Sequence, residues 1–171
     1  MLPTVRRTWA PKGRTPILRH RTRSHTKDSA IGALSISPQR RRLGLYLHWH
    51  PDKNITQGEV ILFLRDLLAH LRGNVILVWD RLNAHRSAQV KLWRAAYPRL
   101  SIEWFPPYAP DLNPMEYVWG HLKYHRLSNH GLFELDAIHA QAKLEADDVA
   151  SRQPLLRSFV HAAQLPIRLR S

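Results

Sequence analysis

Two acidic residues stand where a fold could bring their carboxylates together. Asp80 directly follows the apolar run Val75–Trp79, which is typical of a β-strand, and Glu116 lies at the start of the helix expected after the next strand. In open α/β sheets, ligands and catalytic groups gather at the carboxyl ends of parallel strands. Two neighbouring crossovers would therefore place both carboxylates at the same edge of the sheet, where they could act on one ligand.

Both acids also have an ordinary structural explanation. An aspartate after a buried strand commonly caps a turn. With Asn113 as N-cap and Pro114 in the first helical position, Glu116 falls at N3, where a carboxylate completes a capping box. The residues taken alone leave the two interpretations open.

Two longer segments carry a resemblance. Residues 75–87 read VILVWDRLNAHRS, and residues 105–123 read FPPYAPDLNPMEYVWGHLK. The first segment is a strand that ends in Asp with a His five residues later, and the second is a proline-rich loop that enters a helix through Asn-Pro-x-Glu. Together they closely resemble DDE transposases of bacterial insertion sequences related to the mariner superfamily. The 35 residues between Asp80 and Glu116 agree with the spacing of the last two acids in that superfamily. The block Thr8–Pro16 also resembles the segment after the family's first strand, so the resemblance covers roughly residues 4 to 127.

The resemblance implies a fold and an activity. The expected fold is ribonuclease H-like, an integrase-like mixed sheet with flanking helices in which three carboxylates hold two divalent cations, Mg²⁺ or Mn²⁺. Asp80 would be the second acid and Glu116 the third, with both as catalytic residues and metal ligands in DNA strand cleavage and strand transfer. Carboxylates suit this role because Mg²⁺ is a hard ion that prefers oxygen ligands.

One part of the family pattern is missing. The first acid should lie just before Leu2, yet no acid precedes Asp28. Asp28 lies in a basic loop and Asp52 follows a strand, so both are poor substitutes. The family's upstream helix-turn-helix modules are also absent. The sequence therefore predicts a truncated or frameshifted fragment that lacks its first strand and is inactive alone. The alternatives are a catalytically inactive nucleic-acid-binding remnant and another ribonuclease H-like nuclease.

The charge favours nucleic acid as a partner. The chain has 26 Lys+Arg against 13 Asp+Glu, and residues 1–50 alone carry a net charge of +10. Planar guanidinium groups suit bidentate contact with phosphate oxygens, although a merely solvated basic surface would have the same composition. The resemblance implies transposon-end and target DNA, a homodimer on that DNA, and a cytoplasmic, nucleoid-associated bacterial protein. The candidate DNA-binding residues are Arg6, Arg7, Lys12, Arg14, His85, Arg86 and Lys123.

Several other classes of site are disfavoured. The chain has no cysteine, which excludes disulfides, iron–sulfur clusters and thiolate zinc sites. Its longest apolar runs are far shorter than the ~20 residues that span a bilayer. His121 and His125 have helical i, i+4 spacing but no third zinc ligand is evident, and His48 and His50 are interpreted as half-buried polar groups on one strand face.

The expected elements alternate between strands and helices. A hairpin over residues 29–37 and 43–50 precedes a helix that begins at 57 and ends near Gly73. The next element is strand 75–79. Because this strand is apolar on both faces, we expect helices to cover it on both sides. Residues 1–128 are assigned to the catalytic domain without its first strand, and 129–171 to its helical tail. The remaining expected elements are helix 88–97, strand 101–105, a helix from 114, and helices 135–150 and 155–164.

Overall fold

The computed structural model describes residues 29–51, 53–123 and 135–170. Its elements follow the expected order closely. They are β1 (Ser29–Ile36), β2 (Leu43–His50), α1 (Gln57–His70), β3 (Val75–Trp79), α2 (Ala88–Ala95), β4 (Leu100–Trp104), the short 3-10 helix η1 (Pro110–Leu112), α3 (Pro114–His121), α4 (Leu135–Ser151) and α5 (Gln153–Ala162).

The predicted hairpin is confirmed. Strands β1 and β2 pair antiparallel, with Ser29 opposite His50 and Ile36 opposite Leu43. The turn closes through Ser37, whose N–H donates to the Arg42 carbonyl at 2.8 Å and whose hydroxyl accepts from two backbone N–H groups of the turn. The apolar residues at every second position of β2 face one side, because successive strand residues point to opposite faces.

The second sheet is a parallel pair. Strands β3 and β4 are joined through α2, with Val75 opposite Leu100 and Trp79 opposite Trp104. Within the described residues this pair and the hairpin form two separate two-stranded sheets. The expectation that helices cover β3 on both faces is wrong, since Ile76 and Val78 are 71% and 45% exposed. Apolar residues on both faces of a strand do not by themselves show that both faces are buried.

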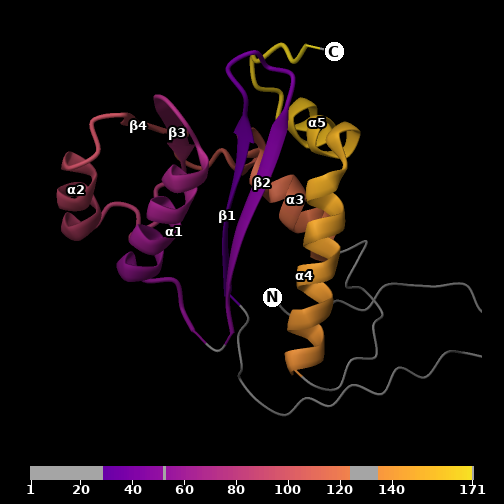
Figure 1. Ribbon diagram of the computed structural model, residues 1–171, viewed down its shortest axis with the longest axis horizontal. Coiled ribbons are helices and arrows are strands. Elements are labelled where there is room, and N and C mark those ends of the chain that lie inside the picture. Colours follow the sequence, from indigo (N-terminus) through magenta and orange to yellow (C-terminus); the bar gives the residue numbers. More distant parts are fainter. Residues whose placement is uncertain (1–28, 52, 124–134, 171) are drawn as a thin grey trace, which may run out of the picture.

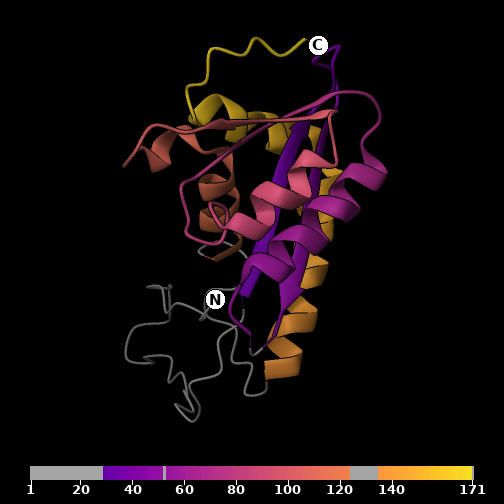
Figure 2. The same ribbon diagram turned by 90° about the vertical axis from the view of Figure 1, so that its left-hand side faces the viewer.

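Helices lie on both sides of the hairpin (Figures 1 and 2). On one side, α1 and α2 pack with the parallel pair around a core that contains Val60, Leu64, Trp79 and Val90. On the other side, α3, α4 and α5 cover the hairpin, and α4 runs alongside β2 in both views. That second core is built from Leu43, Met115, Val118, Leu122, Ala146, Val149, Leu156, Phe159 and Val160.

Helix α3 packs against β1 at Gly32. A Cβ atom at this glycine would lie 2.7 Å from the methyl carbon of Met115, 2.5 Å from Leu47 and 3.1 Å from the ring of Trp119. Real Cβ atoms essentially never come nearer than 3.0 Å to another heavy atom. The absence of a side chain at Gly32 therefore lets the first turns of α3 seat on the sheet.

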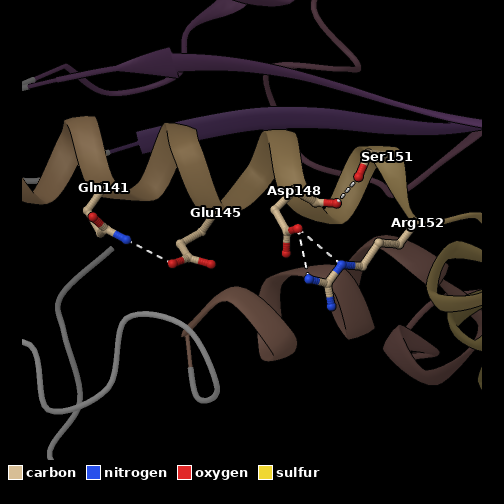
Figure 3. A network of polar contacts seen from close by, with 5 residues as sticks. All are labelled: Gln141, Glu145, Asp148, Ser151 and Arg152. Carbon is tan, nitrogen blue, oxygen red and sulfur yellow. Dashed lines mark hydrogen bonds and ion pairs between the residues drawn. The ribbon is translucent and has the colours of Figure 1, made fainter.

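The junction between α4 and α5 carries a small polar network (Figure 3). The Arg152 guanidinium donates to an Asp148 carboxylate oxygen at 2.9 and 3.1 Å, and the Ser151 hydroxyl donates to the Asp148 carbonyl at 2.7 Å. One turn apart on α4, the Gln141 amide donates to the Glu145 carboxylate at 2.8 Å. These contacts lie near the surface and contribute little energy.

The amino end of α1 is held by the predicted capping box. The Thr56 hydroxyl accepts from the Gly58 N–H, and the Glu59 carboxylate accepts from the Thr56 N–H at 2.9 Å and from the Thr56 hydroxyl. These bonds to Thr56 lower the pKa of Glu59 from 4.5 to about 2.

This capping box gives a pH-dependent contribution to stability. Because the pKa of Glu59 is lower in the folded state, its contribution is present above pH 4.5 and is lost as the pH falls towards 2. We expect the urea midpoint to fall across that window, and the fall to be smaller in Glu59→Gln. Glu103→Gln serves as the control, and an equal pH response in wild type and Glu59→Gln would contradict the expectation.

Candidate functional site

Asp80 lies at the carboxyl end of β3, as predicted. Just before it, the Trp79 carbonyl accepts from the Phe105 N–H at 3.0 Å, so the parallel ladder extends to the last residue of β3. Just after it, the chain turns, and the Leu82 N–H donates to Asp80 Oδ1 at 3.2 Å. The Asp80 side chain is 42% exposed. The sheet thus presents a partly exposed carboxylate at its edge.

His85 fixes the orientation of that carboxylate. Its Nδ1 lies 2.7 Å from Asp80 Oδ1, and since an ionised carboxylate only accepts hydrogen bonds, Nδ1–H is the donor. The His85 ring stacks on the indole of Trp79, with ring centroids 4.4 Å apart and an angle of 3° between the planes. The imidazole is therefore held on one face by the core and at one edge by Asp80.

The hydrogen bonds keep Asp80 ionised. Burial raises the pKa of the Asp80 carboxyl, but the bonds from His85 and from the Leu82 N–H outweigh it, and the pKa lies below its usual value of 3.8. Both bonds go to Oδ1. Within the described residues Asp80 Oδ2 has no hydrogen-bond donor, which leaves this oxygen available to a ligand.

Glu116 occupies the first turn of α3, also as predicted. Asn113 is the N-cap, and its side chain accepts from the Met115 N–H at 3.1 Å. The reciprocal half of a capping box is not formed in the structure described, because the Asn113 N–H donates to the Pro110 carbonyl at 2.9 Å instead of to Glu116. The Glu116 side chain is exposed. In contrast to Glu59 in α1, its carboxylate is not used in capping and remains available.

The structure does not assemble a complete metal site from these acids. Among residues 29–51, 53–123 and 135–170, no group of three or more His, Cys, Asp or Glu side chains is arranged to hold a metal ion. The two poor substitutes, Asp28 and Asp52, lie outside the described residues. The candidate ligands are thus two acids, each with oxygen atoms that no capping interaction uses.

The structure places some of the other predicted site residues, and the rest lie outside the described residues. Arg86 is exposed on the loop after Asp80, and Lys123 is half-buried after α3. His121 packs near Phe159, with ring centroids 5.6 Å apart, while His125 lies outside the described residues. The basic candidates Arg6, Arg7, Lys12 and Arg14 also lie outside them.

The comparison with protein-family models decides the family. Residues 2–138 match the family of DDE superfamily endonucleases, which is well over half of the chain. The chain belongs to the DDE superfamily endonucleases. The matched range includes both Asp80 and Glu116 together with His85.

The fold of the chain agrees with this family assignment. It is similar to a chain in the crystal structure of the Mos1 strand transfer complex, with a TM-score of 0.60 and 17% sequence identity. The match covers 94% of this chain and 47% of that chain, so the present chain spans about half the length of that relative. This likeness confirms the ribonuclease H-like fold class. A search of curated proteins found no match. In the described part of the chain, no helix is both long and apolar enough to cross a membrane.

Two groups that support the site were not predicted from the sequence. The stack of Trp79 on His85 joins the core to the site, and the backbone N–H of Leu82 supplies the second bond to Asp80. A tryptophan that ends an apolar strand directly before a site aspartate was the available signal for the first. A backbone donor has no sequence signal.

Proposed function

We propose that this DDE superfamily endonuclease acts on DNA in transposition, through metal-dependent strand cleavage and strand transfer, with Asp80 and Glu116 as metal ligands. The observation that supports this most strongly is the Asp80 carboxylate, which His85 and the Leu82 N–H hold by Oδ1 while Oδ2 stays open. The turn uses only Oδ1 of Asp80, so its capping contacts leave Oδ2 free to bind a cation.

The donor chemistry fits a hard divalent cation. Asp80 and Glu116 offer carboxylate oxygens that no described residue occupies, and such oxygens are the ligands that Mg²⁺ and Mn²⁺ prefer. When bound, the ions activate the attacking oxygen and stabilise the leaving oxygen of a phosphodiester. Asp80 would hold the ion, His85 would keep Asp80 in place, and exposed Arg86 would contact DNA phosphate.

A second candidate function is nucleic-acid binding without cleavage. It is favoured by one observation, which is that no group of three metal-binding side chains is present among the described residues. A cage of two carboxylates binds Mg²⁺ weakly, since this ion otherwise keeps its waters. On this alternative the chain binds DNA but does not cut it by itself.

The two functions are separated by one experiment on two proteins. Mn²⁺ binding is measured by calorimetry, and nicking of duplex DNA is measured in Mn²⁺ and in EDTA. The proteins are the 171-residue chain and a form extended upstream in its reading frame through the acid expected before Leu2. Metal-dependent nicking by either protein supports the endonuclease. DNA binding by both proteins with nicking by neither supports the binding function.

His85 gives a more specific expectation for the same assay. Removing a group that orients a metal ligand typically lowers metal affinity or activity 10–100-fold. We therefore expect His85→Ala to weaken Mn²⁺ binding about 10-fold or more, because Asp80 loses the donor at 2.7 Å. His85→Asn, which can still donate near this position, should recover part of the loss. His70→Ala, on α1, is the control, and unchanged Mn²⁺ affinity in His85→Ala would show that His85 is only a packing residue.

A further inference from the structure

Six arginines gather at the tip of the β1–β2 hairpin. Three of them are consecutive in the hairpin turn, one comes from α5, and two come from the segment after α5. In both views the hairpin tip and the carboxyl-terminal segment lie side by side (Figures 1 and 2). We call these residues the hairpin-tip arginine cluster: Arg40, Arg41, Arg42, Arg157, Arg168 and Arg170.

Backbone contacts hold the cluster together. The Arg170 N–H donates to the Arg40 carbonyl at 2.8 Å, and the Arg157 guanidinium donates to the Arg41 carbonyl. The Arg41 and Arg42 N–H groups donate to the Ser37 hydroxyl at 3.2 and 3.0 Å. Hydrogen bonds to the backbone therefore hold the segments that carry these arginines next to each other.

The terminal segment directs its arginines outwards. Leu169 is half-buried and packs against the hydrophobic core. Arg168 and Arg170, on either side of it, are exposed, as expected where successive residues of an extended chain point to opposite sides. Packing of Leu169 thus fixes which way the two guanidinium groups face.

No carboxylate of the described residues pairs with the cluster. Among residues 29–51, 53–123 and 135–170, none of its six arginines forms an ion pair. Gathering like charges raises the electrostatic energy of the folded chain. A polyanion bound there would relieve this repulsion, and guanidinium groups on a preformed surface match phosphate oxygens in geometry.

We propose that the hairpin-tip arginine cluster is a binding site for the phosphate backbone of duplex DNA. It is a contact surface separate in sequence from the Asp80 loop and from the basic amino-terminal segment. The inference rests on the proposed function, in that it takes DNA as the polyanion. It adds a second point of contact to the one expected near Asp80.

The test measures how DNA binding depends on salt. The cluster variant replaces Arg41, Arg42, Arg168 and Arg170 by Gln, and leaves Arg157 in place because it bonds to the backbone. The control variant removes the same number of charges elsewhere by replacing Arg65, Arg72, Lys91 and Arg94 with Gln. Circular dichroism and melting curves check that both variants fold. Affinity for a duplex oligonucleotide is then measured in Ca²⁺ from low to high salt.

We expect the magnitude of the slope of log affinity against log salt to be smaller by about 3 to 4 in the cluster variant, since each phosphate contact contributes ~0.9 to this magnitude. Its affinity at ~0.1 M salt should fall about 100-fold or more, on the same counterion-release relation. The slope of the control should change by less than about 1.

Other results would overturn the proposal. These are an unchanged slope in the cluster variant, an equal loss in the control, or a wild-type preference for double-stranded RNA that the cluster variant loses. Metal-dependent cleavage, measured separately with Asp80→Asn, reports on the proposed function whatever the outcome for the cluster. Failure of the proposed DNA contact at the cluster is therefore distinguishable from failure of the proposed cleavage function.

Discussion

Asp80→Asn should abolish metal-dependent DNA cleavage, lowering its rate at least about 1,000-fold, while affinity for duplex DNA changes less than about twofold. The amide keeps the shape of the side chain and can still accept from the Leu82 N–H. It removes the negative charge and replaces one ligand oxygen by a nitrogen that cannot bind a hard cation. Loss of several kcal/mol of metal-based stabilisation corresponds to this change in rate. Cleavage and binding are measured on whichever form of the protein cuts the wild-type substrate.

Glu116→Gln should give the same result, because its carboxylate is exposed and is not used to cap α3. Glu103→Gln is the matched control, since Glu103 is an exposed acid on β4. It should retain cleavage within about twofold. Full cleavage by either Asp80→Asn or Glu116→Gln would remove that residue from the set of ligands. A proportional loss of DNA binding would show instead that the substitution had damaged the fold.

Arg99→Ala should destabilise the fold far more than replacement of an ordinary surface arginine does. The Arg99 guanidinium donates to the carbonyls of Leu71 and Gly73, both at 2.8 Å, and to that of Leu68. These carbonyls lie at the carboxyl end of α1 and just beyond it, where the helix leaves acceptors unpaired and where a positive charge is favourable. One side chain thus joins α1 to the start of β4.

We expect Arg99→Ala to lower the free energy of unfolding by about 2–3 kcal/mol, given the strength of hydrogen bonds to charged groups. The melting temperature should fall by roughly 5–10 °C for a chain of this size. The stability of Arg99→Lys should lie between those of Arg99→Ala and wild type, because lysine keeps the charge but cannot reach three carbonyls. Arg94→Ala, at the end of α2, is the control and should stay within about 0.5 kcal/mol of wild type. Equal stability of Arg99→Ala and wild type in urea unfolding would contradict the expectation.

Local patterns were sufficient to predict most of the elements. Alternation along β2 and the capping box at Thr56 both appear in the structure at the predicted residues. The helix boundaries differ by a few residues, as at α2, which ends at Ala95 and not at residue 97. The burial of β3 was not predictable, because the apolar run has the same composition whether the face with Ile76 and Val78 is covered or exposed.

The site was predictable in its residues more than in its geometry. Spacing and motif placed Asp80 after a strand and Glu116 at a helix start, and the structure agrees. No pattern could show that Asp80 bonds to His85 through one oxygen, or that Trp79 stacks on the same ring. The arginines at the hairpin tip come from segments more than 100 residues apart in the sequence. Only the folded chain places them together.

The close approach of α3 to Gly32 has a consequence for how this protein can change over time. Met115, which contacts that glycine, is the residue directly before Glu116. A side chain at position 32 would press on the ends of the Met115 and Trp119 side chains, and where these cannot move aside the helix turn that carries the acid must shift. Misplacement by ~1 Å can cost a catalytic site about 100-fold. A position with no functional group of its own is thereby under the same constraint as the acid. Substitutions of Gly32 should therefore be tolerated only where they leave Glu116 in its position, although the side chains around Gly32 are hydrophobic.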